Sequence, residues 1–121
     1  MILPDSLHIT FKTSNFKEVN VVTMDVRDMI PAAADAADLM RSLSHPQRLL
    51  VLCALGSEEK SVAQLREELD VEQVPMSQQL MRLRADGLVE ARREGTSVYY
   101  RIARPDVLRI IEALQGIYCK P

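Results

Sequence analysis

Two cysteines carry the most distinctive chemistry in this chain. Cys53 lies inside the apolar stretch LLVLCAL, and Cys119 follows 66 positions later, in IYC. Two cysteines at this separation form neither a CxxC metal knuckle nor a disulfide framework, so we expect free thiols in a reducing compartment. Free cysteine is often simply buried, whereas a thiolate is a nucleophile. Cys53 could therefore be a core filler or a chemical trigger.

The histidines, His8 and His45, limit what these thiols could do as catalysts. His45 precedes Cys53 by eight positions, about 12 Å along a helix at about 1.5 Å per residue. No carboxylate is evident that would orient His45 as a general base. We therefore expect no catalytic residues and no enzyme activity, and we interpret His45 as a surface residue at a helix cap.

The composition is that of one globular domain. The chain has 121 residues, of which 47% are hydrophobic and 26% are charged, with no visible repeat or low-complexity tract. No apolar run approaches the roughly 18 residues that span a bilayer, and the first residues lack the pattern of a signal peptide. We expect a cytoplasmic protein with no membrane partner and no cofactor.

Helical periodicity begins at residue 28. Residues 1–27 follow neither a helical nor a strand period, and we interpret them as an N-terminal tail that precedes a domain at residues 28–119. A capping box at residues 44–47 begins a buried helix that Gly56 ends. Before it, a first helix is expected from Asp28, because Ile30, Ala33, Ala37, Met40 and Leu43 fall at helical spacing.

Two short helices, a hairpin and a final helix follow. Ser61 and Gln64 form a second capping box, which begins a helix that runs to about residue 68. The segment at residues 73–87 has an apolar face and a polar outer face. Alternating residues predict a hairpin that turns at residues 94–97. The last helix carries an apolar stripe typical of a chain that pairs with itself: Val107, Ile110, Ile111, Leu114 and Ile117.

The order of these elements predicts a mainly α fold with a small β-hairpin (α+β). It is a winged helix-turn-helix with five helices and a two-stranded wing, whose second motif helix would lie in the major groove of double-stranded DNA. The net charge of −2 argues against non-specific coating of nucleic acid. Residues 71–104 nevertheless hold six arginines against four carboxylates, whereas residues 57–70 hold two basic residues against five carboxylates.

Three stretches carry a family resemblance. LSHPQRLLVLCAL, SVAQLREELDV and MSQQLMRLRADGLVEARREGTSVYYRI resemble the ArsR/SmtB family of bacterial repressors, across residues 28–119. The resemblance implies a homodimeric, DNA-binding transcriptional repressor that releases its operator when a small inducer binds. The expected DNA-binding residues are Gln73, Ser77, Gln78 and Gln79 on the recognition helix, Arg82 on its polar face, and Arg92, Arg93 and Thr96 on the wing.

These residue types suit the roles that the resemblance implies. A glutamine amide can pair with an adenine edge, and arginines on a wing can hold phosphates and fix the register. The chain departs from the family pattern at four positions of the reading segment, so the operator sequence does not follow from the resemblance. These positions are Glu72, Val74, Pro75 and Gln79.

The cysteine pair resembles one branch of that family. Metal-sensing members carry cysteines on the third helix or Asp and His pairs on the last helix, and this chain has neither set. Cys53 and Cys119 are instead similar to the pair of the persulfide-sensing BigR/SqrR branch and the related HlyU type. This resemblance implies redox-sensing cysteines that react with a persulfide or polysulfide inducer and close a sulfur bridge within one subunit. We expect two thiols that face each other slightly beyond disulfide reach.

Three other interpretations of the protein stay open at this point. A general oxidant sensor would form a plain disulfide between the same two thiols. A metal-sensing repressor would need ligands recruited from distant parts of the chain. A winged helix can also bind protein, and the acidic pI near 5.7 is compatible with such a module.

Overall fold

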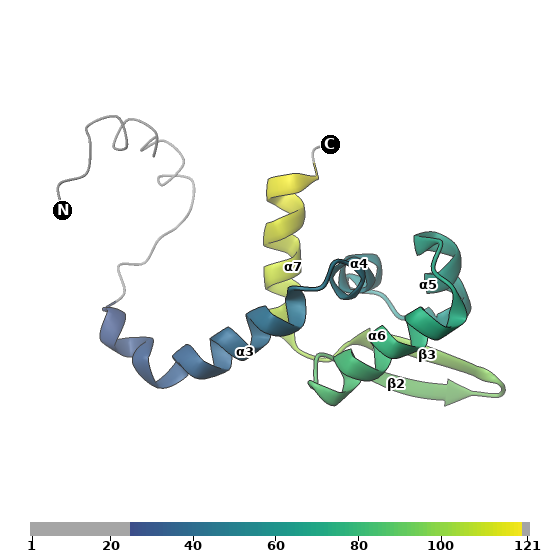
Figure 1. Cartoon of the computed structure of the whole chain (residues 1–121), viewed down its shortest axis with the longest axis horizontal. Helices are drawn as coiled ribbons and strands as arrows, with labels where there is room; N and C mark the ends of the chain where they lie inside the picture. Colours follow the sequence, from purple (N-terminus) through teal and green to yellow (C-terminus); the bar gives the residue numbers. More distant parts are fainter. Residues whose placement is uncertain (1–24, 120–121) are drawn as a thin grey trace. The chain divides into compact units, whose positions relative to one another are not determined.

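The computed structural model describes residues 25–119, and Figure 1 labels its helices and strands. The chain divides into two units, residues 1–34 and residues 35–121, which we describe separately. In the first unit, two 3-10 turns follow each other: η1 (Val26–Asp28) and η2 (Ile30–Ala32). The predicted tail at residues 1–27 lies almost entirely outside the described residues.

α3 (Ala33–Leu43) is the helix that we expected from Asp28, and it starts five residues later than predicted. Pro31 stands in the preceding 3-10 turn, because proline has no amide with which to continue an α-helical ladder. The buried residues of α3 are Leu39, Ser42 and Leu43, and Met40 is 49% exposed. Of the five apolar residues whose spacing predicted the helix, Leu43 is buried, whereas the other four, Ile30, Ala33, Ala37 and Met40, are exposed.

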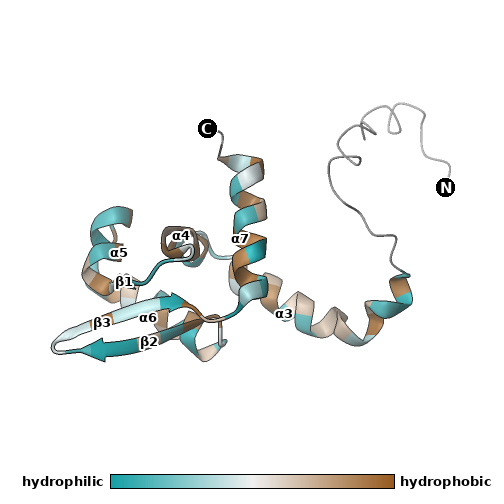
Figure 2. Ribbon diagram, turned by 180° about the vertical axis from the view of Figure 1, so that it is seen from behind, coloured by the Kyte–Doolittle hydropathy of each residue, from teal (hydrophilic) through white to brown (hydrophobic). Residues whose placement is uncertain are grey.

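α4 (Pro46–Leu55) is the central helix of the second unit. It lies between α5 and α7 in Figure 1 and is the most uniformly apolar helix in Figure 2. The predicted capping box is wrong, because Ser44 donates its hydroxyl to the Arg41 carbonyl (2.7 Å) at the end of α3. His45 is the N-cap instead, and its Nδ1 accepts the Gln47 amide at 3.1 Å. His45 therefore lies at the helix start as predicted, but it is the capping residue itself and is half-buried rather than a surface residue.

α5 (Val62–Leu69) and α6 (Gln73–Ala85) form the helix-turn-helix. The capping box at the start of α5 is confirmed: the Ser61 hydroxyl accepts the Gln64 amide (3.1 Å), and Gln64 Oε1 accepts the Ser61 amide (2.8 Å). Asp70, in the left-handed region with φ +52°, ends α5. The predicted buried face of α6 is also confirmed, with Met76, Leu80 and Leu83.

The wing is a three-stranded antiparallel sheet in the order β1-β3-β2, where two strands were predicted. β2 (Val89–Glu94) and β3 (Ser97–Ile102) form the expected hairpin. Glu94 pairs with Ser97 across a two-residue loop, and Gly95 has φ +62°, a conformation that favours glycine. The added strand, β1 (Lys60–Ser61), pairs with β3 and is too short to show a periodic pattern.

α7 (Pro105–Tyr118) begins at Pro105 as predicted and packs against α4 and β3. Its apolar stripe divides in two: Val107 and Ile111 are fully buried, whereas Ile117 and Tyr118 are 63% and 79% exposed. Figure 2 shows apolar residues along α7 up to its last turn. No helix within residues 25–119 is long and apolar enough to cross a membrane.

Candidate DNA-binding surface and thiol pair

α6 presents a mixed outer face opposite its buried residues. Gln73 and Gln78 are exposed as expected, and two apolar side chains lie beside them: Val74 is 65% exposed and Met81 is 69% exposed. Side chains of this helix could therefore offer hydrogen bonds and apolar contacts, and thymine methyl groups in a major groove accept the latter.

The first turn of α6 is held by a polar cluster. Gln73 Nε2 donates to the Ser77 hydroxyl at 3.1 Å, and Gln73 Oε1 accepts from Arg66 of α5 at 3.0 Å. Arg66 thus joins the two helices of the motif. Ser77 is half-buried, so its part in the predicted site is shared with a role in orienting Gln73.

Gln79 lies at the flank of α6 and is half-buried. Its Oε1 accepts a hydrogen bond from Arg48 Nη1 at 3.2 Å, and Arg48 Nε donates to the Ser42 carbonyl at 2.8 Å. Arg48 belongs to α4 and Ser42 to α3. One guanidinium therefore connects three helices. This role could not be predicted, because Arg48 looked like part of a helix start.

Arg82 is anchored at the other end of α6. Its Nε donates to Asp86 Oδ2 at 2.9 Å, and the same oxygen accepts from the Ser42 hydroxyl at 2.6 Å. The Ser42 hydrogen bond lowers the pKa of Asp86, with a smaller contribution from Arg82 and against the effect of burial. Asp86 therefore stays ionised at neutral pH and holds the Arg82 side chain, which is still half exposed.

Arg92 of the wing is engaged by two carboxylates. Its Nη2 lies 2.7 Å from Glu59 Oε1 and its Nη1 lies 2.8 Å from Glu94 Oε2. The guanidinium carbon also lies 4.8 Å from the centre of the Tyr99 ring, a cation–π distance. These carboxylates raise the pKa of Arg92, and Arg92 lowers the pKa of Glu59. Arg92 could bind a phosphate only by exchanging these partners.

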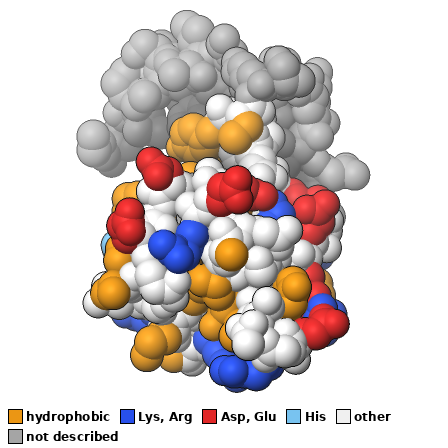
Figure 3. Space-filling model, turned by 90° about the vertical axis from the view of Figure 1, so that its right-hand side faces the viewer, with side chains coloured by type: hydrophobic (Ala, Val, Ile, Leu, Met, Phe, Trp, Pro, Cys, Tyr) orange, Lys and Arg blue, Asp and Glu red, His pale blue; other side chains and the backbone are white. Residues whose placement is uncertain are grey.

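Arg93 and Thr96 are both exposed, and Thr96 lies in the loop at the wing tip. Arg93 pairs in register with Val98, so it lies on the opposite face of the sheet from Arg92. No carboxylate within residues 25–119 lies within ion-pair distance of Arg93. Figure 3 views the end of the molecule that carries α5 and the wing tip, and basic side chains lie along its lower edge.

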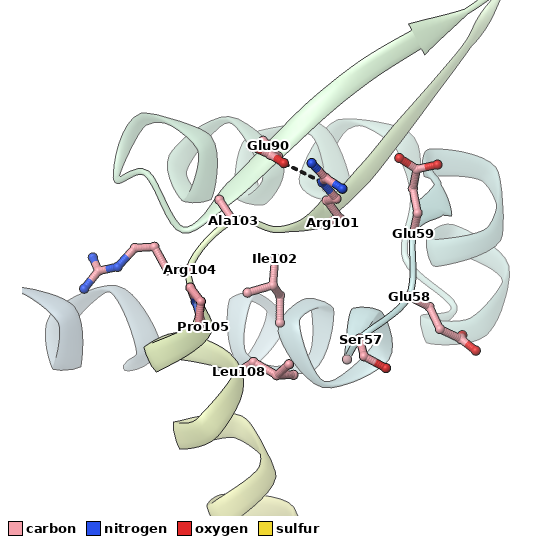
Figure 4. Close-up of a pocket in the computed structure, with 11 residues that line it drawn as sticks. Ser57, Glu58, Glu59, Glu90, Arg101, Ile102, Ala103, Arg104, Pro105 and Leu108 are labelled. Carbon is pink, nitrogen blue, oxygen red and sulfur yellow. Dashed lines mark hydrogen bonds and ion pairs between the residues drawn. The ribbon is translucent and has the colours of Figure 1, made fainter.

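The outer base of the wing encloses a hollow of about 490 Å³ (Figure 4). In Figure 4 Glu90 and Arg101 face each other across β2 and β3, and they form an ion pair. Arg104, at the rim, pairs with Asp106 at 2.6 Å. The basic groups of this hollow are thus already matched by carboxylates, so it offers no free cation of its own for an anionic ligand.

The two cysteines belong to the facing ends of α4 and α7. Gln115 Nε2 donates to the Cys53 carbonyl at 3.4 Å, and Cys119, one turn further on, donates its amide to the Gln115 carbonyl at 2.8 Å. Burial raises the pKa of the half-buried Cys53 thiol, and the negative charge of Cys119 raises it further. Cys119 is exposed. A charge on Cys119 therefore disfavours the ionisation of Cys53.

Two other kinds of site can be compared with the structure of residues 25–119: a catalytic pair of Cys53 and His45, and a metal site. His45 and Cys53 lie near opposite ends of α4, and the imidazole Nδ1 is used as a helix cap. Among residues 25–119, no three His, Cys, Asp or Glu side chains are grouped so that they could hold a metal ion.

Comparisons with known proteins agree with this geometry. The family model described as "Bacterial regulatory protein, arsR family" matches residues 45–91. The Biofilm growth-associated repressor of Agrobacterium fabrum is 39% identical over 105 residues, which are 87% of this chain and 90% of that protein. The transcriptional activator HlyU of Vibrio cholerae is 36% identical over 97 residues, 80% of this chain and 90% of that one.

Solved structures give the same grouping. The transcriptional repressor BigR from Xylella fastidiosa has a TM-score of 0.77 against this chain at 37% identity. The match covers 81% of this chain and 100% of that one. Reduced HlyU from Vibrio cholerae has a TM-score of 0.74 at 36% identity, covering 78% and 99%. These similar proteins are transcription regulators and not enzymes.

Proposed function

Because the chain belongs to the arsR family of bacterial regulatory proteins, we propose that it is a homodimeric repressor that binds operator DNA and releases it in response to reactive sulfur species. The DNA-binding part of this proposal rests on α6 and the wing. Gln73, Gln78 and Gln79 would contact base edges, and Arg93 and Thr96 would approach the backbone from the wing.

Two further arginines have more restricted roles in this proposal. Arg82 would contact DNA from a position that Asp86 fixes. Arg92 would contribute only after exchanging a carboxylate for a phosphate, because Glu59 and Glu94 already bind it. Ser77 would act mainly by orienting Gln73.

Exposed apolar residues on the outer helices support the dimer. Met40 on α3 and Ile117 and Tyr118 on α7 are 49%, 63% and 79% exposed in the single chain. Large apolar side chains are costly to leave in water, and a second copy would cover them. A symmetric dimer would also present two copies of α6 to the two half-sites of an operator.

One observation supports the sulfur-sensing part: Gln115 of α7 donates a hydrogen bond to the Cys53 carbonyl of α4, so the C-terminal parts of the two helices that carry the cysteines lie together. Cys119 is the accessible thiol, so its thiolate would attack the sulfane sulfur of a persulfide, RSSH, and release RS⁻. The product is a persulfide on Cys119. Cys53 is less reactive at neutral pH because its pKa is raised, and it would act second.

The second step closes the bridge with its atoms balanced. If Cys53 attacks the inner sulfur of the Cys119 persulfide, hydrosulfide leaves and a disulfide forms. If the Cys119 persulfide first takes another sulfur from a second RSSH, which leaves as a thiol, the same closing step gives a trisulfide. A direct disulfide needs Cα atoms within roughly 7 Å, and each added sulfur relaxes that limit.

Bridge formation would act on DNA binding through α4. This helix packs against α5, α6 and α7, so tying its C-terminal end to α7 would shift the reading helices relative to the dimer. A shift that disfavours the DNA-bound arrangement by a few kcal/mol is enough to lower operator occupancy strongly.

The experiment titrates operator DNA with wild type, Cys53→Ser and Cys119→Ser. Each protein is tested in three states: reduced, treated with a persulfide donor, and treated with peroxide. We expect the donor to weaken binding by wild type at least tenfold and to leave both variants unchanged. A peroxide response as large as the persulfide response would favour a general oxidant sensor. No salt-dependent binding to any promoter duplex would favour a protein-binding module.

A further inference from the structure

Arg48 connects a residue of the recognition helix to two other helices. Its Nη1 donates to Gln79 Oε1 at 3.2 Å and its Nε donates to the Ser42 carbonyl at 2.8 Å. Ser42 is only 5% exposed, so one anchor of the guanidinium is buried. The guanidinium is planar, and two anchored N–H groups fix its plane.

This contact decides which way the Gln79 amide faces. An arginine offers only donors, so the Gln79 oxygen must face Arg48 and the NH₂ group must face away from it. Gln78 is exposed on the outer face, and no hydrogen bond from another described residue fixes its amide. The two adjacent glutamines therefore differ. Gln78 can turn its amide either way, whereas the hydrogen bond from Arg48 fixes the orientation of the Gln79 amide.

A second hydrogen bond of the same serine, made by its hydroxyl group, supports this arrangement. The Ser42 hydroxyl donates to Asp86 at 2.6 Å, and Asp86 accepts from Arg82 at 2.9 Å. The last turn of α3 thus anchors a side chain near the middle of α6 and another near its end.

We infer that Arg48 is a positioning residue for base recognition, which presets Gln79 as a hydrogen-bond donor to acceptor groups on a base edge. This inference rests on the proposed function, because it takes Gln79 to be a base-reading residue. The acceptors it fits in the major groove are purine N7, guanine O6 and thymine O4, and cytosine N4 is disfavoured because it is itself a donor. Without Arg48 the amide could also accept, and the preference at that base pair would broaden.

The test measures affinity for a duplex that the reduced wild-type protein selects from random sequence, and for every single base-pair substitution of it. The variants are Arg48→Ala, Gln79→Ala and the double variant. Matched controls are Gln78→Ala, on the neighbouring glutamine, and Arg41→Ala, which removes an exposed arginine of α3 that pairs with Asp38. Thermal melting checks folding. Arg48→Lys, which keeps the charge and the stem but lacks the fork, serves as a second variant if Arg48→Ala does not fold.

We expect Arg48→Ala and Gln79→Ala to lose discrimination at the same base pair, from about 5- to 150-fold down to a few-fold, with the double variant no worse than Gln79→Ala. Arg48→Lys should lose discrimination there as well. The salt slope of Arg48→Ala should equal that of wild type, because Arg48 touches no phosphate in this account. Gln78→Ala should act at a different base pair, and Arg41→Ala at none.

Two results would overturn the inference alone: a uniform loss of affinity on all duplexes for Arg48→Ala and Arg48→Lys, or a salt slope reduced by about 0.9, which would make Arg48 a phosphate ligand. If Gln79→Ala itself changes no base preference, the base-reading role of Gln79 in the proposed function fails, and the inference fails with it.

Discussion

Replacing Glu59 with glutamine should strengthen DNA binding and make it more sensitive to salt. In the structure Glu59 accepts two hydrogen bonds from Arg92 Nε, at 3.0 and 2.9 Å, and one from Nη2 at 2.7 Å. The substitution Glu59→Gln removes the negative charge but keeps the side-chain size. Arg92 stays over Tyr99 and keeps only Glu94 as an ionic partner, so it becomes available to a phosphate.

The size of the effect follows from one added phosphate contact. Each contact adds about 0.9 to the slope of log affinity against log salt, so affinity should fall about 3.5-fold more than that of wild type between 50 and 200 mM salt. Affinity at low salt should rise, and folding stability should change little, because the side chains of the lost pair are 51% and 31% exposed and solvent screens their attraction.

The assay is fluorescence anisotropy of a labelled operator duplex at several salt concentrations. Glu58→Gln is the matched control, because Glu58 is adjacent and 73% exposed, and among residues 25–119 its one ion pair is with Lys60, at 3.9 Å. The control changes the net charge equally without freeing Arg92. Equal salt slopes for Glu59→Gln and Glu58→Gln would show that Arg92 gains no phosphate contact. The same conclusion would follow if the double variant Glu59→Gln, Arg92→Ala kept the steeper salt slope of Glu59→Gln.

Three other outcomes are expected. Ser61→Ala removes the capping box of α5 and should lower the free energy of unfolding by about 1 kcal/mol, measured by urea denaturation. Cys53 should be alkylated more slowly than Cys119 at neutral pH and should react faster as pH rises, because its pKa is raised. In Cys119→Ser the pKa of Cys53 should move down, because the charge of Cys119 is gone; the pH dependence of alkylation measures this. Asp86→Asn should make the free energy of unfolding less dependent on pH in the acid range. Ser42 lowers the folded-state pKa of Asp86, so the ionised carboxylate stabilises the fold above the unfolded-state pKa of about 3.9. In wild type this stabilisation is lost as pH falls through the folded-state pKa.

Most of the architecture follows from local patterns. The buried face of α6, the capping box at Ser61 and the hairpin with its Gly95 loop each depend on neighbours within a few residues, and the structure confirms all three. The cap of α4 was misplaced because Ser44 and His45 are both able to cap. Ser44 instead bonds to the end of the preceding helix, a choice that depends on tertiary geometry.

The polar contacts at the reading surface could not be predicted in the same way. Arg48 and Gln79 are 31 positions apart, and Arg92 and Glu59 are 33 positions apart. No sequence period relates such pairs, because they form only when helices and strands pack. The sequence could therefore predict candidate DNA-binding residues, but not which of them are already held by partners.

In the proposed mechanism, a sulfur bridge between Cys53 and Cys119 within one subunit releases DNA. The most direct measurement adds a persulfide donor to the protein bound to a labelled operator, follows the anisotropy, and samples the same mixture for the linked peptides by mass spectrometry and for cross-linked dimers on a non-reducing gel. The account predicts that release and the linkage within one subunit appear with the same time course and that no cross-linked dimer forms. Release with both thiols still free, or full linkage with the DNA still bound, would contradict it.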